Sequence, residues 1–186
     1  METLKLIDHF AKLYPLSGEF RTAFENLLIE KRFRKGQVLH HAGQTPTIWF
    51  VRSGLVKGYY DDLDGKEHVT RFWKEGQIIL LASDMRHKTA ADRIMVLEDS
   101  YLTTISDSGL IHLYHTFREG SKLSSKILLN DRNLSELKSF LSSLPSVQGY
   151  EQFQEIFPAE RILLKDIASY LEITPGRLSE IRRNWR

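Results

Sequence analysis

The stretch LLKDIASYLEITPGRLSEIRR, residues 163–183, decides how the rest of the chain is interpreted. Its apolar residues recur at helical spacing before and after a short polar interval, which is the pattern of two packed helices. Ala168 is small enough to lie where two helices cross at a steep angle. Thr174 offers a side-chain oxygen as an N-cap, and Pro175 follows at the first helical position, where its missing N–H costs nothing. The stretch therefore predicts a helix-turn-helix. The residues expected to face inward are Ile167, Ala168, Leu171, Leu178, Ile181 and Trp185.

The outward side of the second predicted helix is polar and basic. Residues 161–186 include six basic and three acidic residues, a net charge of +3; since the whole chain carries +2, residues 1–160 carry −1. An α-helix fits the major groove of DNA, and a basic face can contact both base edges and phosphates. We therefore expect a DNA-binding module rather than an ordinary helical hairpin. The predicted DNA-facing residues are Thr174, Gly176, Arg177, Ser179, Glu180, Arg182 and Arg183.

Within this set, Arg177, Ser179 and Glu180 are expected to face base edges, and Thr174 and the two arginines after Ile181 to lie nearer the phosphates. Glu172 occupies the turn position where glycine would most easily adopt a left-handed backbone. A residue with a side chain costs on the order of 1 kcal/mol there.

The composition excludes several classes of protein. The 186 residues suffice for one domain or two small ones, and 41% apolar with 11% aromatic residues is a globular composition. The chain has no cysteine, which excludes disulfides, thiolate metal sites and cysteine-ligated iron–sulfur clusters. Its N-terminus, METLKLIDHF, lacks a long apolar run, and no window approaches 18 apolar residues. We expect a cytoplasmic protein with no signal peptide and no membrane partner.

The first part of the chain changes its hydrophobic period. Residues 4–29 have helical spacing, interrupted around Pro15 and Gly18, whereas residues 33–105 form short apolar runs separated by glycine-containing turns. Asp64-Gly65 predicts a hairpin in which both turn residues have positive φ. We expect a β-roll of about eight strands. The predicted strand segments are 38–39, 48–51, 55–60, 68–73, 78–81 and 94–105.

Residues 109–144 return to a helical period and contain a heptad pattern. One polar member, Asn130, interrupts an otherwise apolar series, and an Asn at such a position fixes register between partner helices. We therefore predict a parallel homodimer, although a long helix packed only on its own β-domain would also fit the pattern. Pro145, Ser146 and Gly149 are expected to end this helix, and residues 150–157 to form another. The predicted dimer seam is Leu123, Ile127, Asn130, Leu134, Leu137, Leu141 and, at its end, Leu144.

Taken together, these features resemble the Crp/Fnr family of bacterial transcription regulators, in the branch common in Bacteroidetes. The motifs that carry the resemblance are Gly36-Gln-Val-Leu-x-x-x-Gly43, Ile48-Trp-Phe-Val-x-x-Gly54-x-Val56, Gly76, Val96-Leu97-Glu98-Asp99 and the stretch quoted first. The resemblance covers nearly the whole chain. It implies an α+β fold with an N-terminal β-roll (a jelly-roll-like double-stranded β-helix), flanking helices, a long dimerisation helix and a C-terminal, winged-helix-like helix-turn-helix domain.

The same resemblance implies a division of the chain and a set of partners. Residues 1–115 would form a cyclic-nucleotide-binding-like sensor domain, residues 116–144 the dimerisation helix, and residues 145–186 the DNA-binding domain. The implied function is non-enzymatic: a homodimer binds a two-fold symmetric operator in double-stranded DNA. RNA polymerase and an unidentified small-molecule effector are the further implied partners.

The predicted effector pocket departs from the family pattern. Cyclic-nucleotide binders use a glycine-glutamate pair for the ribose and an arginine followed by Ser or Thr for the phosphate, but this chain has Leu80-Leu81 and Ala90-Ala91 there. A phosphate without a guanidinium group or N–H cluster would be left unpaired, at a cost of several kcal/mol. We predict that cyclic AMP does not bind usefully. The residues assigned to this pocket are Ile79, Leu80, Leu81, Ala90, Ala91 and Arg93.

Two alternatives remain. A true cyclic-nucleotide sensor would keep the fold but bind the nucleotide, with Arg86 or Arg93 recruited for its phosphate. A metal-dependent barrel enzyme would use the scattered histidines, but adjacent His40 and His41 point to opposite faces of a strand and cannot both ligate a metal. His112 and His115 share a helical face without a third ligand placed by sequence. We therefore predict no metal, no cofactor and no catalytic residues.

Overall fold

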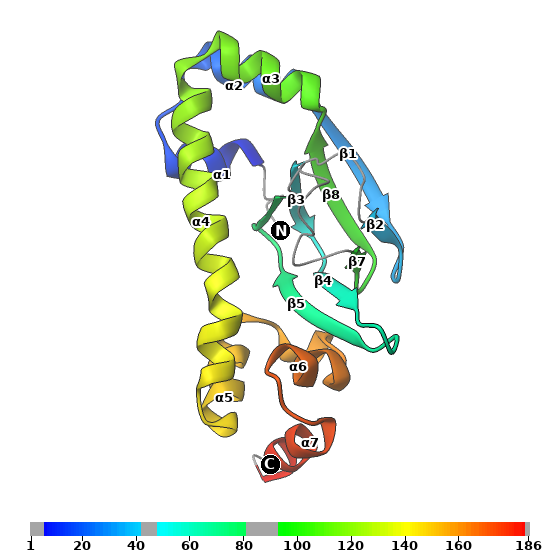
Figure 1. Cartoon of the computed structure of the whole chain (residues 1–186). Helices are drawn as coiled ribbons and strands as arrows, with labels where there is room; N and C mark the ends of the chain where they lie inside the picture. The colour runs from blue at the N-terminus through cyan, green and yellow to red at the C-terminus, as the bar shows by residue number, and fades with distance from the viewer. Residues whose placement is uncertain (1–5, 42–47, 81–92, 185–186) are drawn as a thin grey trace.

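The computed structural model of the chain describes residues 6–41, 48–80 and 93–184. A β-sandwich forms its centre, a long helix runs alongside, and short helices lie at both ends (Figure 1). Each sheet has four strands and every pairing is antiparallel, with strand orders β1-β8-β3-β6 and β2-β7-β4-β5. The strands are β1 (Leu28–Phe33), β2 (Val38–His41), β3 (Ile48–Ser53), β4 (Val56–Asp61), β5 (Glu67–Trp73), β6 (Ile78–Leu80), β7 (Arg93–Val96) and β8 (Ser100–Ile105).

The eight described strands match the predicted number, but two boundaries differ from the predicted ones. The helical start ends earlier than predicted, because α1 (Leu6–Leu13) and α2 (Gly18–Asn26) are followed at once by β1. β1 has mostly exposed side chains and is held by pairing with β8, so no apolar alternation marks it in the sequence. The predicted run 94–105 is two strands, β7 and β8, because the chain turns between Val96 and Ser100.

The hairpin between β4 and β5 forms as predicted, but its turn is different. Asp62 starts the turn: its carbonyl accepts from the N–H of Gly65 at 3.0 Å, and its carboxylate accepts from the N–H groups of Asp64 and Lys66. Gly65 has φ +76°, whereas Asp64 is not among the residues with positive φ. The prediction of a two-residue turn with positive φ at both positions is therefore wrong. The side chain of Asp62 stabilises a longer turn instead.

The long helix is α4 (Arg118–Ser143), which follows α3 (Asp107–Thr116) after one extended residue, Phe117. Ser146 and Gly149, predicted to end the long helix, lie instead within α5 (Ser146–Ile156). Gly149 allows α5 to approach α4 closely, since a Cβ there would lie 2.7 Å from the carbonyl oxygen of Leu141. The glycine thus marks a close helix–helix contact rather than a helix end.

The predicted dimer seam faces largely into the chain's own core. Leu123 and Ile127 are buried among side chains of α1, α2 and the β-sandwich, and Leu141 is buried against α5 and α6. An apolar heptad pattern reports burial without saying which surface provides it, and the assignment of these three residues to a partner helix stays a prediction. Asn130 is exposed, and Leu134 and Leu137 are half-buried.

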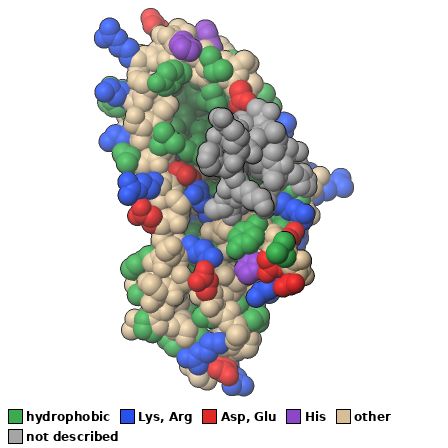
Figure 2. All heavy atoms as spheres, viewed as in Figure 1, with side chains coloured by type: hydrophobic (Ala, Val, Ile, Leu, Met, Phe, Trp, Pro, Cys, Tyr) green, Lys and Arg blue, Asp and Glu red, His purple; other side chains and the backbone are tan. Residues whose placement is uncertain are grey.

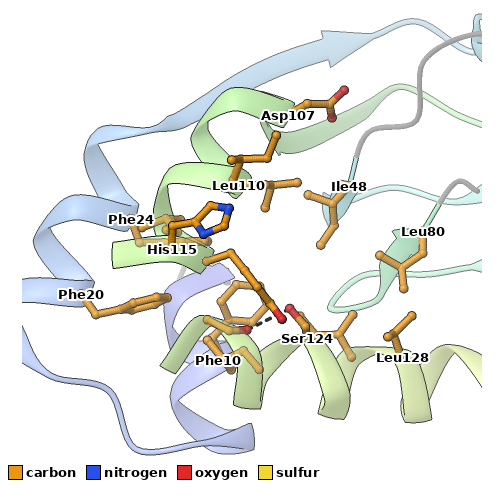
Figure 3. Close-up of a pocket in the computed structure, with 16 residues that line it drawn as sticks. Phe10, Phe20, Phe24, Ile48, Leu80, Asp107, Leu110, His115, Ser124 and Leu128 are labelled. Atoms are coloured by element: carbon orange, nitrogen blue, oxygen red, sulfur yellow. Dashed lines mark hydrogen bonds between the residues drawn. The ribbon is translucent and has the colours of Figure 1, made fainter. Parts of the chain in front are cut away.

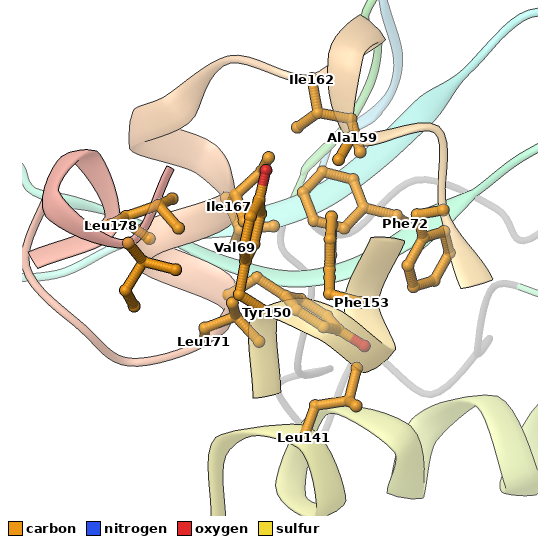
Figure 4. Close-up of a cluster of buried hydrophobic side chains, with 14 of the residues drawn as sticks. Val69, Phe72, Leu141, Tyr150, Phe153, Ala159, Ile162, Ile167, Leu171 and Leu178 are labelled. Carbon is orange, nitrogen blue, oxygen red and sulfur yellow. The ribbon is translucent and has the colours of Figure 1, made fainter. Parts of the chain in front are cut away.

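The chain ends in a short helical unit, formed by α5, a 3₁₀ turn (Ala159–Arg161), α6 (Leu164–Tyr170) and α7 (Pro175–Asn184). It packs against β5 and the end of α4 around one apolar cluster (Figure 4). Phe72 of β5 is central to that cluster, with its ring centroid 5.7 Å from that of Phe153 and 5.2 Å from that of Tyr170. The helical unit and the β-sandwich therefore share a hydrophobic core. No helix among the described residues is long and apolar enough to cross a membrane.

Candidate nucleic-acid interface

The helices α6 and α7 pack as the sequence predicts. Ile167 and Ala168 of α6 and Leu178 of α7 have no exposed surface, and Leu171 and Ile181 are also buried. These five side chains belong to the cluster shared with α5 and β5 (Figure 4). The predicted inward position of Trp185 lies outside the described residues.

The turn before α7 has both predicted features. Thr174 caps the helix, since its Oγ1 accepts a hydrogen bond from the N–H of Arg177 at 3.1 Å. Glu172 has φ +57°, which confirms the left-handed backbone expected there. Its carboxylate lies 2.9 Å from the ammonium of Lys138 on α4, so the residue that bears this strain also makes an ion pair.

The predicted DNA-facing residues are brought together on the solvent side of α7. All of them are exposed except Arg182, which is half-buried. The side chain of Arg177 makes two contacts with other residues of the chain. Its guanidinium donates to the hydroxyl of Ser146 at 3.2 Å and lies 3.2 Å from the Glu180 carboxylate. This places Arg177 and Glu180 side by side on one face, as their spacing of three predicts.

Polar contacts that the sequence did not reveal fix α6 to the β-sandwich. Lys57 of β4 and Asp166 of α6 form a buried ion pair at 3.2 Å, and Glu67 of β5 also contacts the Lys57 ammonium. Burial raises the pKa of Asp166, against the opposing effect of Lys57. Next to this pair, the backbone N–H of Val69 donates to the hydroxyl of Ser169 at 2.9 Å. Nothing in the spacing of these residues could have identified the contacts, because they join segments about a hundred residues apart.

Arg161, just before α6, makes a second ionic contact with the sandwich. Its guanidinium binds the carboxylates of both Glu75 and Glu98, which lie in turns at the same end of the two sheets. These two carboxylates raise the pKa of Arg161, so the group stays charged. Burial alone would raise the pKa of Glu75, but hydrogen bonds from Arg161 and from the N–H of Gly54 outweigh burial and lower that pKa. The candidate DNA-binding helices are thus connected to the sandwich by two ionic contacts.

The structure describes three of the six residues of the predicted effector pocket: Ile79, Leu80 and Arg93. Ile79 is fully buried in the sandwich core, and Arg93 is ion-paired with Asp61 at 3.0 Å on the surface. The assignment of these two residues to a ligand pocket stays a prediction. Leu81, Ala90, Ala91 and the alternative Arg86 lie outside the described residues. Of the three predicted residues that the structure describes, Leu80 lines a cavity.

Two cavities lie beside α4. The larger, about 450 Å³, is enclosed by α1 to α4 together with Ile48 and Leu80 (Figure 3). The smaller, about 380 Å³, is lined by predicted seam residues Asn130, Leu134 and Leu137 and by Gln77. The sequence identified the phenylalanines that line the larger cavity as packing residues only, and no signal in the sequence marks the space between them.

The described residues contain no group of three or more His, Asp or Glu side chains placed to hold a metal ion. His68, one of the scattered histidines, is accounted for by other contacts. Its Nε2 lies 2.7 Å from the carboxylate of Asp62, and its ring stacks on Tyr60. The side chains of His40 and His41 lie outside the part that the structure describes.

Comparison with known proteins agrees with this architecture. Residues 30–117 match the cyclic nucleotide-binding domain family, a span that covers the β-sandwich and α3. No curated protein matches the chain. Among solved structures, FixK2 from Bradyrhizobium japonicum is similar over 84% of this chain and 83% of its own, with a TM-score of 0.70 and 16% identity.

Two further solved structures are similar over most of their length. A putative transcriptional regulator of the Crp/Fnr family from Eubacterium rectale has a TM-score of 0.68 and 15% identity, over 94% of this chain and 87% of its own. The c-di-GMP responsive global regulator CLP of Xanthomonas campestris has a TM-score of 0.65 and 16% identity, over 91% of each chain. The chain therefore has a cyclic nucleotide-binding-like β-sandwich followed by helices, in the fold of Crp/Fnr regulators.

Proposed function

We propose that this chain is a non-enzymatic, DNA-binding transcription regulator of Crp/Fnr type, in the Bacteroidetes-like branch, and that it acts in the cytoplasm. The observation that carries the proposal is α7: Leu178 and Ile181 hold it on α6, Thr174 caps it, and its polar and basic residues face solvent. These features support a helix-turn-helix, a motif in which the second helix enters the major groove. The shared fold of known regulators supports the same assignment.

The proposal also covers the type of β-fold and the division of the chain into domains. The strand orders β1-β8-β3-β6 and β2-β7-β4-β5 support a jelly-roll-like double-stranded β-helix. We assign residues 1–115 to the sensor domain, 116–144 to the linking helix and 145–186 to the DNA-binding domain. Because Lys57 and Arg161 connect the last unit to the sandwich, a change in the sensor domain would reach α6 through these contacts. RNA polymerase is the proposed partner in transcription.

The proposed regulator is a homodimer, and the exposed side of α4 offers a surface for it. Leu129 and Phe140 are 56% and 51% exposed. At 3.6 residues per turn they lie about three turns apart on the same side of the helix. Sedimentation at micromolar concentration tests this: Leu129→Glu with Phe140→Glu is expected to yield monomer. A wild-type monomer would refute the homodimer. Dimeric symmetry predicts DNA half-sites about 34 Å apart.

The competing function, a cyclic-nucleotide sensor, lacks a phosphate site among the described residues. None of the described residues that line the two cavities beside α4 is a lysine or arginine, and Arg93 is already paired with Asp61. Calorimetric titration with cyclic AMP and cyclic GMP separates the two functions. We expect no saturable heat for either nucleotide; a Kd in the low micromolar range would favour the sensor.

The proposed function is tested by selecting double-stranded DNA from a random pool with the purified chain, then measuring affinity by fluorescence anisotropy between 50 and 200 mM salt. Each neutralised phosphate should make the logarithm of affinity fall with the logarithm of salt by about 0.9. We expect selected DNA to bind more tightly than a scrambled duplex, with a salt-dependent affinity for both. Absence of salt-sensitive affinity for any duplex would refute the proposal.

A further inference from the structure

One wall of the larger cavity beside α4 consists of side chains that are themselves buried. Phe10, Phe20 and Phe24, from α1 and α2, are at most 4% exposed, yet all three line a space of about 450 Å³ (Figure 3). Protein interiors contain few voids larger than a water molecule. An engineered apolar cavity of roughly 150 Å³ stays dry and binds benzene. The cavity here is about three times that size and lies within the range of small-molecule sites, roughly 300–1,000 Å³.

The cavity opens to solvent between α3 and α4. Tyr114 and Leu128, both among its lining residues, are 53% and 61% exposed. Hydrophobic side chains gather around a hollow beside the upper half of α4 in Figure 2. A small molecule could therefore enter without separating the helices that form the buried wall.

The chemistry of the wall restricts the charge of the ligand. Among the residues that the structure describes, the lining contains no lysine or arginine, and its titratable side chains are Asp107, Tyr114 and His115. His115 is exposed, and Figure 3 shows the Asp107 carboxylate directed away from the apolar side chains. The hydroxyl of Ser124 donates to the carbonyl of Gly120 at 2.8 Å, so its proton is already used. An anionic group inside would lose its hydration without gaining a lysine or arginine partner from the described lining residues.

We infer that this cavity binds an uncharged, apolar small molecule with the bulk of two or three rings. Its walls come mostly from α1 to α4, with Ile48 and Leu80 as the strand contribution. The site is thus distinct from the nucleotide pocket considered in the sequence analysis, with which it shares Leu80. The inference does not depend on DNA binding, because every measurement that tests it is made on the chain without DNA.

A pair of fluorescent probes tests the charge requirement. N-phenyl-1-naphthylamine is neutral, and 8-anilinonaphthalene-1-sulfonate has the same aromatic body with one negative charge. We expect the neutral probe to saturate at one molecule per chain, with a Kd on the order of 10 μM. The sulfonate should bind at least about tenfold more weakly. Equal affinity for the two probes, or no saturable binding of the neutral one, would overturn the inference.

Neighbouring leucines on α4 provide a matched pair of variants. Leu128 lines the cavity, whereas Leu129 is similarly exposed and does not. Leu128→Trp is expected to weaken the neutral probe at least tenfold, and Leu129→Trp to leave its affinity within about twofold. Ser124→Phe, which places a ring inside the cavity, should abolish binding. Circular dichroism checks that each variant is folded.

A second copy of the chain could cover the mouth of the cavity in place of a small molecule. Sedimentation in the same buffer tests this, because it measures whether the chain is a monomer or a dimer when the probe binds. If the neutral probe binds monomer alone and dimerisation displaces it, the cavity belongs to an interface and the inference is wrong. Binding with the same stoichiometry per chain in monomer and dimer supports a small-molecule site.

Discussion

The ammonium of Lys57 on β4 lies 3.2 Å from the carboxylate of Asp166 on α6, and the two side chains are only 4% and 1% exposed. The second carboxylate oxygen of Asp166, Oδ2, has no hydrogen-bond partner in the part of the chain that the structure describes. Glu67 contacts the same ammonium, so one cation balances two acids. A buried charge pair therefore joins two segments that lie more than a hundred residues apart in the sequence.

Removing the ammonium group of Lys57 should destabilise the folded chain. We expect Lys57→Met to lower the free energy of unfolding by about 3–5 kcal/mol, because it leaves a buried carboxylate uncompensated. The double variant with Asp166→Leu should recover much of that loss, since an apolar pair of similar volume often replaces a buried ion pair at little cost. Urea unfolding measures all three proteins. Lys66→Met, at an exposed lysine, is the control and should change the free energy of unfolding by less than about 0.5 kcal/mol. If Lys57→Met changes the free energy of unfolding as little as this control does, the prediction is contradicted.

Glu75 and Asp166 should respond to pH in opposite directions. Hydrogen bonds lower the pKa of Glu75 in the folded chain. The Glu75 carboxylate therefore contributes to the free energy of unfolding above the unfolded pKa of about 4.3, and this contribution is lost as pH falls through the folded pKa. The stability advantage of wild type over Glu75→Gln should therefore shrink between pH 6 and pH 3.

Burial raises the pKa of Asp166. The Asp166 side chain therefore contributes to the free energy of unfolding below the unfolded pKa of about 3.9, and this contribution is lost as pH rises through the folded pKa. Wild type should therefore lose stability relative to Asp166→Asn as pH rises. Urea midpoints at pH 3, 4, 5 and 6 measure both variants. Parallel trends for the two would contradict the assigned directions.

Gly54 should be intolerant of a side chain. Its φ is +109°, and a Cβ would lie 2.0 Å from the Ser100 Oγ and 2.9 Å from the Ser100 Cα. Gly54→Ala is expected to cost about 3 kcal/mol or more, since backbone strain and a clash act together. Gly36→Ala is the matched control: Gly36 also has positive φ, +82°, but open space around it, so about 1 kcal/mol is expected. Equal costs in thermal or urea unfolding would show that the clash is relieved.

Relief of strain at Glu172 should stabilise the chain. A glycine adopts φ +57° without the steric cost of a side chain, but Glu172→Gly also removes the ion pair with Lys138. Glu172→Gln removes the charge and keeps the side chain, so it isolates the ionic contribution. We expect Glu172→Gly to be about 1 kcal/mol more stable than Glu172→Gln. Equal urea midpoints would show that the turn tolerates the side chain.

The sequence predicted elements that depend on local spacing and missed contacts that depend on the tertiary fold. Thr174, Pro175 and the apolar residues of α6 and α7 act within a few residues of one another, so their roles could be predicted and the structure agrees. Of the heptad stripe on α4, Leu123, Ile127 and Leu141 are buried. Which surface buries Leu123 is settled by how the sandwich docks, and no local pattern contains that information.

Arg177 is predicted to read one base pair, and its present contacts make that testable. To reach a base edge, its guanidinium must leave Ser146 and Glu180, both of which are weak surface contacts. Arg177→Ala should cost roughly 1–3 kcal/mol on selected DNA and relax discrimination at one position. Since no phosphate contact is lost, the salt dependence should stay unchanged. Arg132→Ala, which removes an exposed arginine from α4, controls for net charge. If Arg177→Ala weakens all duplexes equally and lowers the salt slope by about one, Arg177 contacts a phosphate instead.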